Sequence, residues 1–115
     1  MKILISGSRY YTNYNKIYEI FKRLPEDTCI IHGDCVGADK LAESVAIKLN
    51  FKCIAYPANW SKGKSGGPLR NQQMLDENPD IERAIIFHEC LENSKGTKDM
   101  IKRLEKKKIS FLIFD

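Results

Sequence analysis

The sequence lacks any apolar run near the roughly 20 residues that a membrane-spanning helix requires. Its opening, MKILISG, has one lysine and a short apolar run, but tyrosines and asparagines follow where a signal peptide would continue. We therefore expect no secretion signal, no membrane partner and a cytoplasmic location. A chain of 115 residues has room for one hydrophobic core, so residues 1–115 are expected to form a single domain.

Familiar catalytic and cofactor motifs are also missing. The chain holds neither the GxGxxG dinucleotide fingerprint nor the GxxxxGK[ST] phosphate loop. Its GSR segment lacks the GxSxG nucleophile elbow. The four cysteines form no CxxC pair, which favours reduced thiols in a cytosolic protein. The sequence therefore contains no familiar motif that assigns a reaction or a cofactor, and we expect that no cofactor is required.

The charge excess is modest. The formal net charge is +4, and much of it lies in KRLEKKK at residues 102–108, which a solvated helix face explains. This balance is compatible with a phosphate-bearing ligand. Together with the lack of an aromatic ladder, it argues against nucleic acid as a partner.

Five short, continuous apolar runs mark the expected strands, at residues 2–6, 28–32, 52–56, 83–88 and 110–114. Continuous runs are typical of strands buried on both faces of a parallel sheet. Helical spacing lies between them, most clearly over residues 38–49, and also at about 17–24, 68–78 and 100–104. Right-handed crossovers then predict a Rossmann-like, doubly wound α/β fold, with a five-stranded parallel sheet in the order 3-2-1-4-5 and helices on both faces.

Ligands of open α/β sheets bind outside the carboxyl ends of the strands, so the segments after the strands hold the candidate site. They include GSRYY, HGDCVGAD, GKSGGPLRNQQM and HECLENSKGT, in which glycine and small polar residues gather. The candidate ligand-binding residues are Gly7, Ser8, Arg9, Gly33, Asp34, Gly37, Ala38, Asp39, Arg70, Asn71, Ser94, Gly96 and Thr97.

In GDCVGAD, two glycines bracket a turn that opens into the clearest helix. The bare backbone amides and positive dipole of a helix start form an anion site, although Gly33 and Gly37 also suit a plain tight turn. Asp39 lies in the first helical turn, where the dipole favours a carboxylate. It is expected to accept a hydrogen bond either from a ligand hydroxyl or from the neighbouring loop.

Arg9 and Arg70 are expected at strand ends or helix starts, where the helix dipole disfavours a cation. A bound anion explains such a position better than a solvated surface does. Asn71 suits either a ligand contact or a local cap, and Trp60 either stacks on a base or anchors packing.

The SKGT segment is expected at the start of the fourth helix, and it is a second candidate anion site. Ser94 or Thr97 is a suitable cap, while Gly96 allows a phosphate close to the backbone. A simple helix cap explains the serine and threonine nearly as well.

Two histidines, His32 and His88, close the second and fourth strands, with Cys35 and Cys90 nearby. In the predicted order the first strand separates those two strands, and the spacing matches no zinc pattern. We therefore expect no metal site there, and packing or loop roles for these residues.

The segments GSR, HGDCVGADKLA, YPANW, GKSGGPLRNQQM and SKGTKDMI together resemble the YspA-type (YpsA-related) branch of the SLOG superfamily, through almost the whole chain. That superfamily includes LOG-type phosphoribohydrolases, the DNA-processing protein DprA and domains proposed to sense nucleotide or ADP-ribose-like ligands. The resemblance implies a Rossmann-like fold, a nucleotide-derived ligand and self-association, for which the face bearing the first and fourth helices is a candidate. It also implies that the thirteen candidate residues lie in ligand loops, with Ser94, Gly96 and Thr97 facing a phosphate.

Two positions depart from the family pattern. LOG-type enzymes carry a catalytic glutamate three residues after the threonine of GT, where this chain has Met100, which transfers no proton. The adjacent Asp99 is turned by about 100° around the helix, away from that direction. Asp34 replaces a glycine of many relatives and adds a negative charge near the expected phosphate.

Three functions follow in order of preference. The first is a nucleotide-binding module with a sensing or regulatory role, and the second is a hydrolase of a nucleotide N-glycosidic or phosphate bond. In the hydrolase, Arg70 would position the substrate and Asp39 or Asp34 would supply the acid–base chemistry. A DprA-like DNA-binding protein is third.

Overall fold

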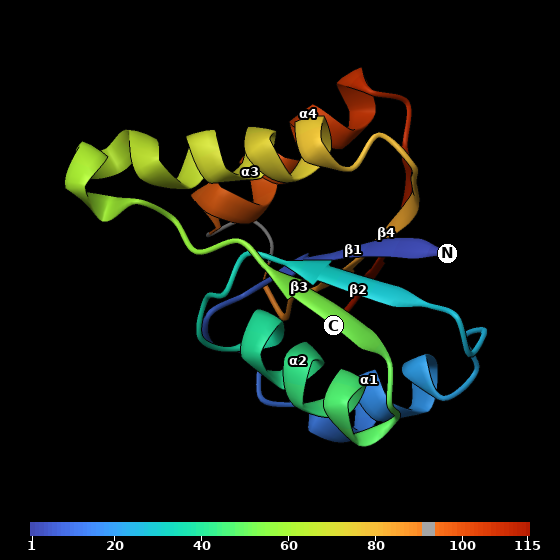
Figure 1. Ribbon diagram of the computed structural model, residues 1–115. Coiled ribbons are helices and arrows are strands. Elements are labelled where there is room, and N and C mark those ends of the chain that lie inside the picture. Colours follow the sequence, from blue (N-terminus) through green and yellow to red (C-terminus); the bar gives the residue numbers. More distant parts are fainter. Residues whose placement is uncertain (91–93) are drawn as a thin grey trace.

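The computed structural model describes residues 1–90 and 94–115, and it has a five-stranded, all-parallel sheet between two layers of helices (Figure 1). The strand order is β3-β2-β1-β4-β5, which confirms the predicted Rossmann-like α/β class and order. The strands are β1 (Lys2–Gly7), β2 (Cys29–His32), β3 (Lys52–Ala55), β4 (Ile81–Phe87) and β5 (Ser110–Phe114).

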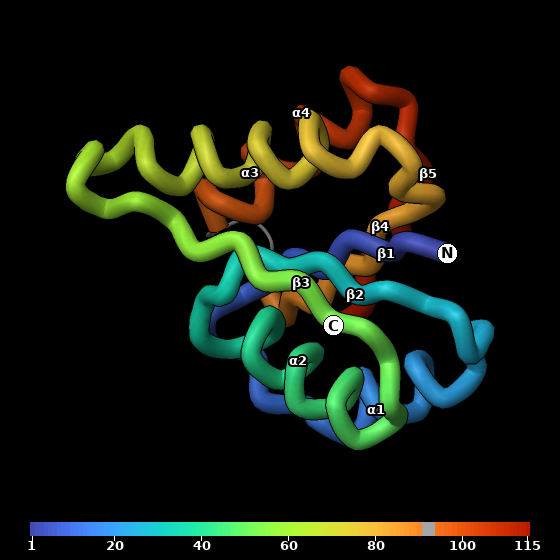
Figure 2. Tube along the Cα trace, in the orientation of Figure 1, coloured from blue at the N-terminus to red at the C-terminus, as the bar shows by residue number. Residues whose placement is uncertain are grey.

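Helices cover both faces of the sheet (Figure 2). The helices α1 (Tyr14–Phe21) and α2 (Ala38–Lys48) lie on one face. The other face carries α3 (Gly66–Glu77), which follows the short 3-10 helix η1 (Trp60–Ser65), and α4 (Lys95–Lys106). The first and fourth helices therefore lie on opposite faces, and the expectation of one face that bears both is wrong. Among the described residues, no helix is both long and apolar enough to cross a membrane.

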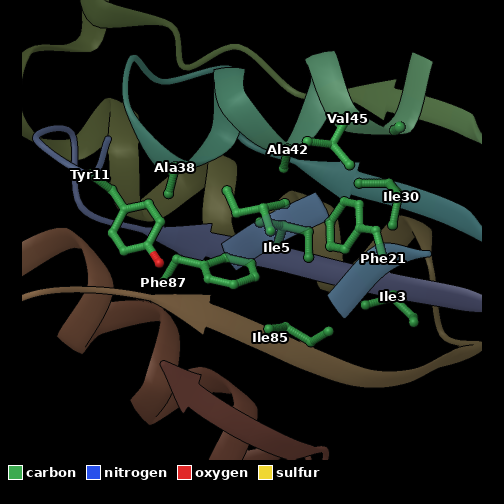
Figure 3. Packing of buried hydrophobic residues seen from close by; sticks show 12 residues of the cluster. Ile3, Ile5, Tyr11, Phe21, Ile30, Ala38, Ala42, Val45, Ile85 and Phe87 are labelled. Carbon is green, nitrogen blue, oxygen red and sulfur yellow. The ribbon is translucent and has the colours of Figure 1, made fainter. Parts of the chain in front are cut away.

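The alternation of side chains along the central strands divides the core in two. Ile3 and Ile5 of β1 pack under α1 and α2, while Leu4 packs under α3 and α4. Figure 3 shows Phe21 and Phe87 among the aliphatic side chains of the first cluster, and their ring centroids lie 6.4 Å apart. The central strands are thus buried on both faces, as continuous apolar runs predict.

The edge strands differ from that expectation. Leu112 and Ile113 of β5 are 52% and 45% exposed, and both ends of β3 are exposed. An edge strand has a neighbour on one side only, so its side chains are covered from fewer directions.

Two helix boundaries also differ. The first helix ends at Phe21, ahead of its predicted end at about residue 24, because the chain forms a turn over residues 22–24. The helix expected from Pro68 begins two residues earlier, at Gly66. A proline at the third position breaks no helical hydrogen bond, since amides in the first turn have no intrahelical acceptor.

Candidate functional site

The carboxyl ends of β1 and β4 lie side by side at the point where the strand order reverses. The Ser8 amide donates a 2.9 Å hydrogen bond to the Phe87 carbonyl, and the Ser8 hydroxyl donates a 2.8 Å bond to Glu89. From the start of α4, the Thr97 hydroxyl donates to the Gly7 carbonyl over 3.2 Å. Ser8 and Thr97 are both buried, so segments far apart in the sequence are joined at this switch point.

Gly7 and Ala38 are small because α2 packs very close to β1. A Cβ on Gly7 would lie 2.1 Å from the Phe87 carbonyl oxygen and 2.7 Å from the Ala38 Cβ. Real Cβ atoms do not approach other atoms so closely, and Ala38 is itself fully buried. Packing of the chain against itself therefore accounts for both residues.

The start of α2 is closed by the protein's own carbonyls. Gly37 has φ 83°, a conformation that favours glycine, and a Cβ there would lie 2.3 Å from the Ser8 carbonyl oxygen. The Ala38 amide donates to that same Ser8 oxygen over 2.9 Å, and the Lys40 amide donates to Cys35 over 3.2 Å. The loop after β1 thus occupies the place where the sequence predicts an anion, and the tight-turn alternative accounts for Gly37.

The Asp39 carboxylate faces the β2–α2 loop. Its Oδ2 accepts hydrogen bonds from the amides of Gly33 (3.0 Å) and Cys35 (3.3 Å), and the residue is 6% exposed. Burial raises the pKa of this carboxyl to about 6, although the Cys35 amide, the Arg70 charge and the Gly33 amide all act to lower it. Its Oδ1 is buried and has no hydrogen-bond partner among the described residues. Of the two expected roles for Asp39, the geometry matches the loop contact.

Arg70 bridges the ends of β2 and β3. Its Nη1 donates to the Gly33 carbonyl and, over 3.4 Å, to the Tyr56 carbonyl, while its Nε donates to Asn71 over 3.0 Å. A Cβ on Gly33 would lie 2.5 Å from that Nη1, so the glycine makes room for the guanidinium. Backbone carbonyls thus stabilise the cation that the sequence places near a helix start.

Asn71 connects α3 to α4. Its Nδ2 donates to Asp99 over 3.0 Å and to the Gly96 carbonyl over 3.5 Å. Burial would raise the pKa of Asp99, but hydrogen bonds from Arg103 and Asn71 outweigh it and hold the pKa below its usual value. Met100, at the position of the LOG-type glutamate, is fully buried in the core under α3 and α4.

Among the described residues, no other segment closes the start of α4 as the β1 loop closes that of α2. The Ser94 hydroxyl oxygen caps the helix by accepting from the Thr97 amide over 3.2 Å. Gly96 is exposed, and a Cβ built on it would meet no atom within 4 Å. No contact among residues 1–90 and 94–115 requires a glycine here, and the ligand contact that the sequence predicts at Gly96 stays a prediction.

The glycines ahead of Arg70 have a role that sequence reasoning missed. A Cβ on Gly66 would lie 2.5 Å from the Asn59 carbonyl oxygen, and one on Gly67 would lie 3.5 Å from the Trp60 ring. Because Gly66 and Gly67 have no side chains, the Trp60 indole can pack against the start of α3. Trp60 nevertheless remains 60% exposed, so it packs with one part of its surface and presents another to solvent.

Arg9 and Asp34 lie on the α1/α2 side of the carboxyl edge. Arg9 lines an open hollow of about 470 Å³ together with Tyr10, Gly37 and Lys40. Asp34, with φ 58°, pairs with Lys40, and this hydrogen bond is the main cause of its lowered pKa. The charge that Asp34 adds to the loop is therefore balanced by Lys40.

The two histidines hold loops. His32 Nδ1 accepts from the Asp34 amide and His88 Nδ1 from the Cys90 amide, each over 2.9 Å. Each ring therefore fixes the turn that follows its strand. The sequence gives no signal for this role beyond the same histidine position at two strand ends.

His32 also lies in a cluster with Glu43 and Cys53, whose potential ligand atoms are within 4.8 Å of one another. Burial lowers the pKa of His32 against the opposing effect of Glu43, so the ring is neutral. Because Nδ1 accepts a hydrogen bond, the proton of the neutral ring is on Nε2, 3.0 Å from Glu43 Oε2. Although His32 Nε2 and Glu43 Oε2 are close, their geometry does not make a hydrogen bond. A metal at Nε2 would need a lone pair there, so this tautomer opposes metal binding.

Comparison with known proteins assigns the family. The model of the YspA, cpYpsA-related SLOG family (YAcAr) matches residues 1–63, more than half of the chain, while no curated protein matches it. The matched part contains the loops after β1 and β2 and ends before Arg70 and the start of α4. The chain belongs to the YspA, cpYpsA-related SLOG family.

Proposed function

We propose that this protein binds a nucleotide or a nucleotide-derived ligand, of the nucleoside phosphate, NAD or ADP-ribose class, and that binding serves a sensing or regulatory role. Membership of the SLOG family is consistent with a nucleotide-related function. The ligand lies at the carboxyl edge of the sheet, over the switch point between β1 and β4.

The observation that carries this proposal is the difference between two helix starts at the same edge. The first amides of α2 bond to Ser8 and Cys35, whereas α4 begins with exposed Lys95 and Gly96. A phosphate placed at α4 would meet the positive end of the helix dipole and the Lys95 charge. The open space at Gly96 allows it to approach the backbone.

The second support is the polar surface beside that position. Glu89 is exposed, and its carboxylate accepts a hydrogen bond from the Ser8 hydroxyl. The pKa of Glu89 is lowered mainly by a backbone hydrogen bond and next by this bond from Ser8. An ionised carboxylate at this place suits the hydroxyl groups of a ribose. Met100, at the position of the LOG-type glutamate, is buried and transfers no proton. Binding of a nucleotide needs no such proton donor, whereas LOG-type catalysis does.

The test is a thermal-shift screen with AMP, ADP, ATP, NAD, ADP-ribose and cyclic AMP, with mass analysis of the mixtures for cleavage. We expect at least one of these compounds to raise the melting temperature and to be recovered intact. Recovery of a free base would instead support the hydrolase. Failure of all six to stabilise the protein would contradict the proposal.

The sharpest variant is Gly96→Asp. An acidic residue in the first turn of a helix is compatible with the dipole, so α4 should form, but the new charge repels a phosphate. Asn50→Asp is the matched control, because it adds the same charge at an exposed position between α2 and β3. This position lies at the amino ends of the strands, opposite the candidate site. We expect the ligand-induced shift to disappear in Gly96→Asp and to persist in Asn50→Asp.

A further inference from the structure

A second hollow, of about 570 Å³, lies between α3 and α4. Its lining comes mainly from the second half of α4, with Gln72 contributed by α3. The lining residues are Gln72, Asp99, Lys102, Arg103, Lys106 and Lys107. We propose that this hollow binds an oligophosphate, a ligand with several linked phosphate groups.

The charge of the hollow supports an anionic ligand. Four cations line it against one carboxylate, in a chain whose formal net charge is only +4. Asp99 is already engaged by Arg103 and Asn71, and Lys107 lies 3.8 Å from Asp76. Among the described residues, Lys102 and Lys106 have no ion-pair partner. Positive charge is thus concentrated in one recess and only partly neutralised by the protein.

The guanidinium of Arg103 is fixed in position. Its Nε and Nη2 donate to the two oxygens of Asp99 over 2.8 and 3.3 Å, and its Nη1 donates to Gln72 over 2.7 Å. Arg103 therefore enters binding already ordered, which lowers the entropy lost on contact with a ligand. The lysines beside it are mobile donors on long side chains.

The spread of the cations favours linked phosphates over a single one. Residues 102 and 107 lie about 8 Å apart along the axis of a helix with a rise of about 1.5 Å per residue. The volume of the hollow lies within the range of about 300–1,000 Å³ that is usual for small ligands. A compact oligophosphate therefore fits this site better than the extended backbone of a nucleic acid.

The experiment is calorimetric titration at low salt with inorganic tripolyphosphate, with ATP and with a short single-stranded DNA. The variant is Lys102→Gln/Lys106→Gln, because glutamine keeps the helix propensity and removes both unpaired charges. The control is Lys22→Gln/Lys52→Gln, which removes two exposed charges, one at the C-cap of α1 and one on β3. We expect wild type and control to bind tripolyphosphate alike, the hollow variant to bind it about tenfold more weakly, and added salt to weaken binding.

The outcomes separate this proposal from nucleotide binding at the carboxyl ends of the strands. Tripolyphosphate binding that persists in Gly96→Asp supports the hollow. In that same variant, an ATP affinity similar to that for tripolyphosphate identifies the linked phosphates as the recognised group. Lack of tripolyphosphate binding by wild type, or equal binding by all variants, would overturn the proposal. Tighter binding of the DNA strand, lost in the hollow variant, would overturn it in favour of a nucleic-acid surface.

Discussion

At the scale of single residues, Arg70 and Asp39 both bind the backbone of Gly33 in the β2–α2 loop. Arg70 donates to the Gly33 carbonyl, and Asp39 accepts from the Gly33 amide. The cation, the carboxylate and the bare glycine backbone thus form one unit. A ligand at this edge would meet a loop whose shape these contacts have already fixed.

The buried Asp39 carboxyl predicts a pH dependence of stability. Its pKa of about 6 lies above the usual 3.8, so the folded protein holds this proton more tightly than the unfolded chain. The stabilisation by the neutral form is complete below about pH 4 and lost as the pH rises through about 6, an effect of about 3 kcal/mol. Between pH 4 and 7, the unfolding free energy of wild type should therefore fall relative to that of Asp39→Asn.

Urea unfolding of both proteins across that pH range measures the difference. Asparagine does not titrate, so the groups common to both proteins cancel. A stability difference that stays constant from pH 4 to 7 would show that the pKa of Asp39 is not raised.

Gly33→Ala should destabilise the protein, because the new Cβ would lie 2.5 Å from the Arg70 Nη1 and force the guanidinium to move. The expected loss is about 1–3 kcal/mol, as for other overpacked positions. Urea unfolding of Gly33→Ala, Arg70→Ala and the double variant tests the shared cause. The double variant should lose clearly less than the sum of the two single losses, whereas additive losses would contradict a shared contact.

At the scale of secondary-structure elements, α2 and α4 begin at the same edge of the sheet in different ways. The start of α2 is joined to the β1 loop through the Ser8 carbonyl, and a short residue at position 38 lets the helix pack closely. The start of α4 is capped by Ser94 and leaves Gly96 exposed. The proposed phosphate is placed at α4 and not at α2 because, among the described residues, only the start of α4 lacks such closure.

Gly96→Ala should separate stability from binding. A helical glycine without close neighbours is less stable than alanine, so the substitution should raise the unfolding free energy by up to about 1 kcal/mol. The added methyl group should at the same time weaken nucleotide binding. A stabilised variant with unchanged affinity would remove Gly96 from the site.

Ser94→Ala should remove the cap of α4 and lower the unfolding free energy by about 1 kcal/mol. Denaturant unfolding measures this loss. Ser94→Asp is the control, because an aspartate caps equally well and should retain stability. Equal losses in both variants would contradict the cap.

At the scale of the whole molecule, the sheet has a well-covered centre and exposed edges. Hydrogen exchange should be slowest for β1 and β4, which lie between other strands, and faster for β5, whose outer edge has no neighbouring strand within the described residues. Amide exchange followed by NMR tests this order. Protection of β5 equal to that of β1 would contradict it, and would indicate that another chain covers this edge.

The fold could be predicted from the sequence because its signals are local. Continuous apolar runs and helical spacing mark the elements, and general rules of handedness then order the strands. The grouping of the candidate residues at one edge follows from the same rules. Their contacts do not, because the closure of α2 by Ser8 joins residues about 30 positions apart and the seat of Trp60 depends on how η1 packs against α3.

The most direct test of nucleotide binding at the β1/β4 edge is an NMR titration that follows the seven glycine amides. With ADP-ribose or the best nucleotide of the thermal screen, we predict the largest shift at Gly96 and a smaller one at Gly7. The amide of Gly63, in η1, should stay unchanged and serves as an internal reference. Shifts that spare Gly96 and Gly7, with any nucleotide that binds, would contradict the account.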